Sequence, residues 1–583
     1  MSTLFADTRW RDQNVSLLQN LSKPSAILET TLQANPLPPP EEAQVLFNTY
    51  LDGSHVQNPF LLRRDIQQLY HSVFSASRRI GSRPLLPPCV QRQMNFRVFM
   101  LLAIGSVPLY RSGRHKYHPY GYFLTAMEHL DCNLLSRGLD SIQDLLLVVR
   151  FGIYHHIGTS IWELTTMCMR ICIEQNLHKP PRLEARARTS LLRQQLQRRV
   201  FWECYMIDRY SSITLDRPFA IAENDVQIGF PADASDEEID AAEASGSFED
   251  LDCFCRTIPC RVPGETTEMS VFFLCVRLRK ITSKIHAKFR HQEASVPGDH
   301  STMEQITASG KIYADMGELL YELQQWRLSA PVFASPQSLY QMQEWYDLLH
   351  VRERLLLVRK AIDVVPKSYN TPPEDLLSLC LEYAISTITT FCSLFDDNKI
   401  TFTRSYFQML FTAGLSVMFC LSSMKGQPST THVRATEAVE VSGIALKRMG
   451  KELSDAVHYV AVYEALWSHV MGKLRIAPRL RDEEGNRPYH ILSHNEPSTP
   501  HREVLENGHI TYPCDPLAQH PGCNHALLSN NNLPLDHDSE LDPSPFTLDI
   551  FGDNAFWDME YGLGEYAYGD PLQFSSVVPS DTL

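Results

Sequence analysis

Apolar residues recur at helical spacing along most of this 583-residue chain, and this periodicity limits the folds that the chain can adopt. Segment 161–176 is the clearest case, because Leu164, Cys168 and Ile171 fall on one face of a helix. Few segments show the two-residue alternation of β-branched residues that indicates strands. We therefore expect an all-α fold, with one large multi-helix domain over residues 43–475.

Proline residues and polar stretches divide the helical pattern into segments. Pro218 ends a long helix that reaches Thr214. Segment 231–264 is acidic and rich in small residues, so we expect a loop there. Other helices are expected at residues 91–106, 119–135, 142–158, 269–290, 303–329, 338–362, 373–395, 402–424, 431–453 and 455–471.

An uncharged run of 19 residues, Tyr406–Met424, is long enough to raise the question of a membrane span. Gln408, Thr412 and Ser416 place a polar stripe at i, i+4 spacing along it. Such a stripe favours a central helix of a large domain, so we expect no membrane association.

Both ends of the chain differ from its centre. Residues 1–42 are polar and end in a group of prolines, which predicts a mobile N-terminal arm. No Lys or Arg follows Arg502, whereas residues 503–583 hold 14 of the acids in a chain of net charge −15. We expect residues 476–583 to form a disordered acidic tail.

Large apolar residues are mixed with the acids of the tail between Leu541 and Phe574. Acids keep such a segment solvated and leave its aromatic rings available to a partner, which is typical of activation segments. A second interpretation is that residues 556–568 fold back on the helical domain as an autoinhibitory or packing segment, and a third is an inert tail. The candidate activation residues are Phe546, Phe551, Phe556, Trp557 and Tyr561.

Two stretches carry a recognisable set of residues. The first, 167–178, ends in Leu-His, and the second, 197–210, is followed by Arg-Pro and, seven residues beyond that proline, by an aspartate. The residues concerned, called the signature residues below, are Leu177, His178, Arg199, Phe201, Trp202, Tyr205, Asp208, Arg209, Arg217, Pro218 and Asp225.

The order and spacing of the signature residues resemble the regulatory, or middle-homology, domain of fungal zinc-cluster transcription factors, with core residues 161–231. The resemblance implies a helical regulatory domain and a nuclear regulator of transcription that controls a metabolic or secondary-metabolite gene set. It also implies possible partners: a second copy or a zinc-cluster factor as dimer partner, and coactivators.

The helix over 197–215 has a physical interpretation of its own. Its apolar residues form a face so broad that the helix must be largely buried. Asp208 and Arg209 must then be paired, because a lone buried charge is costly, and we expect them to tie the helix to a neighbour. Arg199 and Glu203 form an i, i+4 pair. Asp216 stands where the family has glycine, and a left-handed cap there costs about 1 kcal/mol.

The zinc cluster of this family has no counterpart among these residues. The first cysteine is Cys89, and the sequence contains no C-x2-C, so no zinc-binding or DNA-contact residue can be assigned. We expect no cofactor or metal, and contact with DNA only through a partner or an N-terminal module that is missing here. Cys253, Cys255 and Cys260 could bind a metal, but three reduced cysteines in a loop are favoured.

Two other features have ordinary interpretations. A solvated helix face is favoured over phosphate contacts for the run Arg182, Arg186, Arg188, Arg193, Arg198 and Arg199. His155 and His156 are expected to pack within a helix, and no catalytic motif is present, so we expect no enzyme. The alternative to a transcription regulator is an adaptor that does not bind DNA and titrates a related factor by heterodimerising with it.

Overall fold

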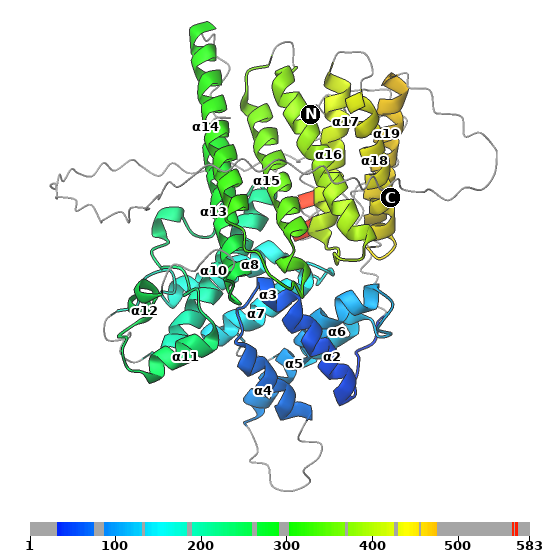
Figure 1. Ribbon diagram of the computed structural model, residues 1–583. Helices are drawn as coiled ribbons and strands as arrows, with labels where there is room; N and C mark the ends of the chain where they lie inside the picture. The colour runs from blue at the N-terminus through cyan, green and yellow to red at the C-terminus, as the bar shows by residue number, and fades with distance from the viewer. Residues whose placement is uncertain are drawn as a thin grey trace, which may run out of the picture. The chain divides into compact units, whose positions relative to one another are not determined.

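The computed structural model describes residues 32–74, 87–130, 134–182, 189–258, 265–290, 302–367, 371–424, 430–453, 456–474, 563–564 and 566–568. Helices dominate all of these ranges up to residue 474, and none of the described residues forms a strand (Figure 1). The predicted all-α class is confirmed. Short helical elements not discussed further are α3 (Ser54–Gln57), α4 (Arg63–Phe74), η4 (Leu134–Ser136) and η6 (Leu339–Gln341).

The N-terminal part of the domain is built around α5 (Pro88–Arg111), which packs against α2 (Pro40–Asp52) and α6 (Pro119–Glu128). Proline at the first position of each of these helices fixes a helical φ where no hydrogen-bond donor is needed. In the next helix, α7 (Leu139–Gly152), every residue except Asp140 is buried.

Of the predicted N-terminal arm, residues 1–42, the structure describes residues 32–42, and residues 1–31 lie outside the description. Helix α2 begins at Pro40, and Asn35 is fixed to α6 before it. The Asn35 side chain donates to the carbonyl of His118 at 2.9 Å, and its backbone N–H donates to that of Gly121 at 2.9 Å. The prediction of an arm is thus wrong for this stretch, because Asn35 is anchored on α6 and residues 40–42 belong to α2.

The centre of the fold is α10 (Leu191–Thr214), which lies against α8 (Ile161–Glu174) and α13 (Ser270–Arg290). Serine caps begin both α8 and α10, where Ser160 accepts from the N–H of Glu163 and Ser190 from that of Arg193. Nearly every side chain of α10 from Leu191 to Ser212 is buried, as its apolar pattern predicts.

The C-terminal part is a bundle of long helices that lie side by side in Figure 1. Two of them are apolar enough by length and composition to cross a membrane, but 72% of the apolar stretch of α17 and 56% of that of α16 are buried inside the protein. The helices are α14 (Thr302–Leu328), α15 (Gln343–Val364), α16 (Glu374–Asp396), α17 (Arg404–Ser423), α18 (Thr430–Gly450) and α19 (Val457–Leu474).

The prediction of a loop over 231–264 is wrong for two stretches. Helix α11 (Asp236–Ala244) begins with a reciprocal capping box between Ser235 and Glu238, and α12 (Leu251–Thr257) is capped by Asp250. A Ser followed three residues later by Glu was the available signal. The acidic residues that suggested a loop instead supply caps and first-turn charges.

His155 and His156 lie just beyond the end of α7 rather than within a helix. Both are buried, and the His155 ring stacks on Phe151 with centroids 5.1 Å apart. Burial lowers the pKa of both imidazoles, that of His156 to about 3, and nearby arginines lower it further. Both residues are thus neutral packing groups, as the sequence predicted.

A close approach of backbones at Gly105 gives a test of the packing between α2 and α5. A methyl group added there would lie 2.2 Å from the Leu46 carbonyl oxygen, which belongs to a helix and cannot step aside. We expect Gly105→Ala to lower the free energy of unfolding by about 2–3 kcal/mol in urea denaturation.

Gly317→Ala in α14 is the matched control, because nothing lies within 4 Å of the added methyl. It should leave stability unchanged or raise it by up to about 1 kcal/mol, the helix propensity difference. Equal stability of the two variants would contradict the described contact.

Candidate functional site

The signature residues gather around the C-terminal half of α10 and the segment that follows it. Asp208 and Arg209 are fully buried and bind each other at 2.5 Å between Oδ2 and Nη1. Asp208 accepts from the backbone N–H of Ala220 at 3.0 Å, and Arg209 donates to the carbonyl of Ile221 at 2.9 Å. The predicted pairing of these charges is confirmed, and their neighbour is the segment 216–230.

Two aromatic rings lie against the guanidinium group of Arg209. Its guanidinium carbon lies 4.3 Å from the ring centroid of Tyr205 and 4.2 Å from that of Phe219. Arg209 also donates to Glu223 at 3.3 Å, and the Tyr205 hydroxyl donates to the same carboxylate at 2.9 Å. The charge is therefore held between two ring faces, which is favourable when water is excluded.

Two residues that stand where the family has glycine adopt the left-handed conformation. Asn176 has φ of 58° and Asp216 has φ of 49°. Asn and Asp tolerate this region better than other side chains, so both helix ends keep the geometry that glycine normally provides. Beyond Asn176, the His178 carbonyl accepts from the N–H groups of Gln227 and Ile228 at 2.9 and 3.0 Å.

The remaining signature residues join this same region. Trp202 donates from Nε1 to the carbonyl of Gly229 at 3.0 Å, and the Arg217 guanidinium lies 4.6 Å from the Trp162 ring centroid. Leu177 and Phe201 are buried in the core, Pro218 lies near the start of segment 216–230, and Asp225 is exposed in η5 (Glu223–Asp225). These positions make the signature a means of fixing segment 216–230 on α10.

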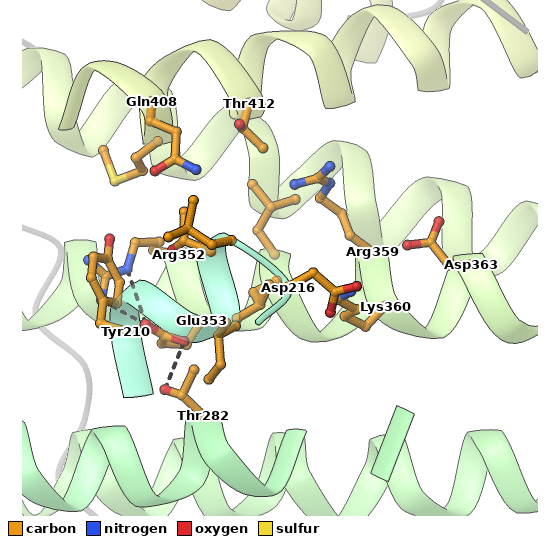
Figure 2. Close-up of a pocket in the computed structure, with 16 residues that line it drawn as sticks. Tyr210, Asp216, Thr282, Arg352, Glu353, Arg359, Lys360, Asp363, Gln408 and Thr412 are labelled. Carbon is orange, nitrogen blue, oxygen red and sulfur yellow. Dashed lines mark hydrogen bonds and ion pairs between the residues drawn. The ribbon is translucent and has the colours of Figure 1, made fainter. Parts of the chain in front are cut away.

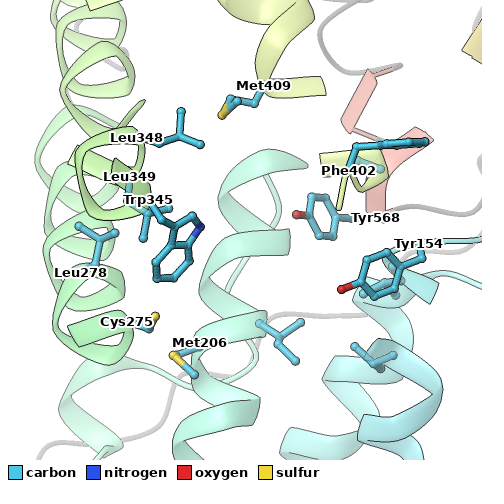
Figure 3. Close-up of a cluster of buried hydrophobic side chains, with 14 of the residues drawn as sticks. Tyr154, Met206, Cys275, Leu278, Trp345, Leu348, Leu349, Phe402, Met409 and Tyr568 are labelled. Atoms are coloured by element: carbon cyan, nitrogen blue, oxygen red, sulfur yellow. The ribbon is translucent and has the colours of Figure 1, made fainter. Parts of the chain in front are cut away.

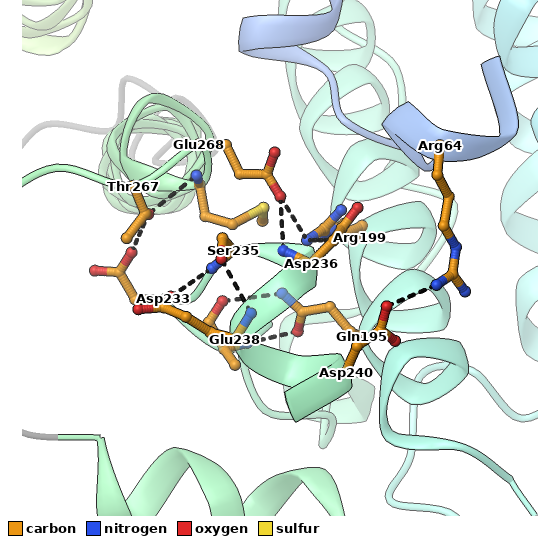
Figure 4. A network of polar contacts seen from close by, with 12 residues as sticks. Arg64, Gln195, Arg199, Asp233, Ser235, Asp236, Glu238, Asp240, Thr267 and Glu268 are labelled. Atoms are coloured by element: carbon orange, nitrogen blue, oxygen red, sulfur yellow. Dashed lines mark hydrogen bonds and ion pairs between the residues drawn. The ribbon is translucent and has the colours of Figure 1, made fainter. Parts of the chain in front are cut away.

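Arg199 does not pair with Glu203 as predicted. It points instead toward α11, where Nη2 lies 2.6 Å from Asp236 and 3.6 Å from Glu268. Figure 4 shows this network, in which Gln195 also exchanges two hydrogen bonds with the backbone of Ala232. Because Asp236 and Glu268 both face Arg199, the tertiary contacts outcompete the local i, i+4 pair.

The run of arginines from Arg182 to Arg199 also differs from the prediction of a solvated helix face. Arg193 is exposed, but Arg198 and Arg199 are buried, and Arg198 binds Asp252 at 2.6 Å and the Phe230 carbonyl at 2.9 Å. Arg182 is exposed, whereas Arg186 and Arg188 lie outside the described residues. Of the described arginines of the run, Arg182 and Arg193 are solvated, whereas Arg198 and Arg199 hold α12 and α11.

Glu203 is left fully buried, with neither carboxylate oxygen hydrogen-bonded to any residue that the structure describes. Burial raises the pKa of this carboxyl to about 7, although the positive charge of Arg150 opposes the change. Arg150 and Glu203 line a small cavity of about 130 Å³ together with Tyr568. A buried group that titrates near neutral pH is thus placed at the centre of the domain.

Tyr568 comes from the predicted tail and lies in the core of the domain. It belongs to a short piece, residues 563–564 and 566–568, which we call the docked segment (Figure 3). The Tyr568 carbonyl accepts from Ser160 at 3.1 Å, and its hydroxyl is hydrogen-bonded to Ser405. Its ring meets that of Tyr210 edge to face, with centroids 5.2 Å apart.

The rest of the docked segment is equally well packed. Leu563 is fully buried, and the Tyr566 ring lies 5.7 Å from Phe407, 5.5 Å from Tyr459 and 4.5 Å from the Arg404 guanidinium. At Gly564 any side chain would begin 2.8 Å from the Thr214 carbonyl oxygen. The fold-back of this part of the tail, one of the three interpretations, is therefore present.

Other predicted residues fall outside the description. The candidate activation residues Phe546, Phe551, Phe556, Trp557 and Tyr561 lie outside the described residues, and so does Cys260. Cys253 and Cys255 are half-buried on α12 rather than in a loop. Within the described ranges no three His, Cys, Asp or Glu side chains are grouped as metal ligands.

A larger cavity was not predicted from the sequence. It has a volume of about 600 Å³ and lies between the end of α10, α15 and α17 (Figure 2). Tyr210 and Arg352 line it, and both line the smaller cavity beside Tyr568 as well. No pattern along one helix marks this cavity, because its walls come from four separate parts of the chain, Thr282 of α13 included.

The raised pKa of Glu203 predicts a dependence of stability on pH. The unfolded carboxyl loses its proton near pH 4.5 and the folded one near pH 7, so stability must fall as pH rises through this window. Glu203→Gln removes the ionisable group. We expect the variant to gain about 1–3 kcal/mol over the wild type between pH 5 and pH 7.5, measured by urea denaturation.

Glu437→Gln on the exposed side of α18 is the control, and its stability should follow the wild type at both pH values. If the difference in the free energy of unfolding between Glu203→Gln and the wild type does not grow with pH, the carboxyl is ionised, and stabilised, in the folded state.

Three regulators with curated descriptions are similar to this chain. The negative regulator of pleiotropic drug resistance of Candida glabrata is 26% identical over 164 residues, covering 27% of this chain and 16% of the relative. The positive regulator of purine utilization of Emericella nidulans is 21% identical over 470 residues, covering 66% and 42%. The pyrimidine pathway regulatory protein 1 of Saccharomyces cerevisiae is 22% identical over 367 residues, covering 62% and 37%.

This chain spans less than half the length of each of these relatives. No solved structure matches it. The model of the fungal specific transcription factor domain matches residues 47–349, more than half of the chain and all of the region that holds the signature residues. The chain therefore belongs to the fungal specific transcription factor domain family.

Proposed function

We propose that this chain regulates transcription in the nucleus and controls a metabolic or secondary-metabolite gene set. The observation that carries the proposal is the family match over residues 47–349, together with a fold in which the signature residues fix segment 216–230. Two of the similar regulators are described as acting on purine utilization and on the pyrimidine pathway. Both names support a role in the control of metabolism.

The spacing of the cysteines bears on how the chain would reach DNA. The 583 residues contain no C-x2-C, so the zinc cluster of the family is not encoded in them. We propose that the chain reaches promoters through a dimer with a zinc-cluster factor or through a module encoded before Met1. The alternative, supported by the same lack of a cluster, is an adaptor that titrates a related factor by heterodimerising.

The tail has two proposed roles. The acidic and aromatic residues up to Tyr561 are proposed to recruit coactivators, because their composition keeps aromatic rings solvated and available. The docked segment is proposed to restrain this recruitment. Its support is the burial of Leu563, Tyr566 and Tyr568 against the helical domain, immediately after the candidate activation residues.

Chromatin immunoprecipitation with sequencing tests the main proposal on the tagged chain of 583 residues. We expect sharp peaks upstream of a coherent set of metabolic genes. The matched control is the same chain with Asp208→Ala, which strands Arg209 in the core and should abolish the peaks by unfolding the domain. A soluble, expressed wild-type chain without peaks would favour the titrating adaptor.

A tethered reporter assay tests the activation residues. The whole chain is fused to an unrelated DNA-binding domain, and Phe546, Phe551, Phe556, Trp557 and Tyr561 are replaced by alanine. We expect at least a five-fold loss of reporter output, because the aromatic rings supply the apolar contact with a coactivator groove.

Replacement of Asn530, Asn531 and Asn532 by alanine is the control, since it changes the same tail without removing any ring. If the variant without the five aromatic residues gives unchanged reporter output at equal protein level, these residues have no activation role.

A further inference from the structure

Helix α14 carries an apolar face that lies open to solvent. In Figure 1 the helix stands at the end of the row of long helices, where it packs on α13 and α15. Two large apolar side chains on its outer side are exposed, Tyr321 to 65% and Leu328 to 69%. No other large apolar side chain among the described residues is as exposed as these two. Two such residues on one face of a helix mark a contact surface, whereas scattered single residues do not.

Two glycines continue this face toward the start of α14. Gly310 and Gly317 are exposed, although glycine is a poor residue inside a helix because it loses more backbone freedom than alanine. At Gly105 and Gly414, inside other helices, an added methyl group would clash with a neighbouring residue. At Gly310 and Gly317 no described atom lies within 4 Å of such a methyl. The fold of one chain therefore does not require these two glycines, whereas a second helix packed closely on this face would.

The spacing of the face is that of a coiled-coil seam, in which steps of four and three residues alternate. None of its members is charged, and the neighbouring Glu318 is paired with Lys288 at 2.5 Å. The opposite side of α14, with Ile312, Leu319 and Trp326, is buried in the domain. The seam residues thus face away from the core; they are Gly310, Ala314, Gly317, Tyr321, Gln324 and Leu328.

The order of small and large residues along the seam is self-complementary. In two antiparallel copies of α14 related by a two-fold axis at residue 319, Gly310 of each copy faces Leu328 of the other, because this pair is centred on that residue. Gly317 and Tyr321 are centred on the same residue and face each other as well. Each of these large side chains then meets a glycine. A parallel pair would instead place glycine on glycine and leave a gap.

We propose that two copies of this chain associate through the seam residues as an antiparallel pair of α14 helices. The contact goes beyond the proposed dimer with a zinc-cluster factor, because it needs neither DNA nor a second kind of protein. The seam spans about 27 Å along the helix axis. A contact of that length lies at the small end of stable interfaces, so the dimer should form at micromolar rather than nanomolar concentration.

Sedimentation velocity of the full chain, from nanomolar to high micromolar concentration, tests the association. We expect monomer to give way to dimer as the concentration rises. Tyr321→Gln combined with Leu328→Gln should raise the dissociation constant at least ten-fold, because these side chains supply the apolar contact. Both are exposed in the single chain, so the variant should unfold in urea at the wild-type midpoint.

Val433→Gln combined with Ile444→Gln on α18 is the matched control. These side chains are 54% and 60% exposed, and their replacement should leave the dissociation constant unchanged. A wild-type chain that stays monomeric at every concentration overturns the proposal. A dimer that survives the loss of Tyr321 and Leu328 forms through another surface and overturns the assignment to α14.

An exchange of small and large residues tests the antiparallel register. Gly310→Leu should weaken the dimer at least ten-fold, because the new side chain meets Leu328 of the other copy. Adding Leu328→Gly restores one large and one small residue to each pair, and should bring the dissociation constant back to within three-fold of the wild type. Gly310→Leu with Tyr321→Gly mismatches the pairs and should not recover.

Equal behaviour of the matched and mismatched double variants would overturn the antiparallel register. Sedimentation does not involve promoters or reporter genes, so the proposed contact succeeds or fails independently of the proposed role in transcription.

Discussion

The buried ion pair between Asp208 and Arg209 is the interaction on which the centre of this structure depends. Each charge is satisfied by the other and by backbone groups of the segment after α10, so neither can be removed without leaving the other unpaired in the core. The pair therefore specifies one position for segment 216–230. Hydrophobic packing alone would hold α10 in the core but would not fix this connection.

Much of the helical framework was predictable because its signals are local. Periodicity located α8 and the bundle helices α16 to α19 to within a few residues, and Pro218 predicted the end of α10 but not its start at Leu191. Short capped helices such as α11 were missed, because their acidic composition outweighed the capping box in the prediction. Pairing partners were less predictable: Arg199 has a carboxylate four residues away in the sequence, yet the fold brings Asp236 and Glu268 closer.

The site was less predictable than the fold. That Asp208 and Arg209 need partners could be predicted from their burial, since a charge on an apolar face is costly when unpaired, but not that they bind each other. The cavity beside Arg352 could not be found, because residues of four helices, α10, α13, α15 and α17, form it. Leu563, Tyr566 and Ala567 do stand at helical spacing, i, i+3 and i+4, but nothing in a single sequence tells which surface such a short apolar face will cover.

The packing of Gly564 and its neighbours bears on the effect of mutations that truncate the chain near its C-terminus. A stop codon or frameshift shortly before residue 563 removes under one twentieth of the chain, and such lesions are usually assumed to leave a protein of this size intact. Here the truncated product would lose the rings that pack on Phe407, Tyr459 and Tyr210, so aromatic side chains that are covered in the full chain would be less well covered. Surfaces of that kind promote self-association and capture by chaperones. Late truncation alleles of this gene should thus behave as losses of protein rather than as losses of a tail.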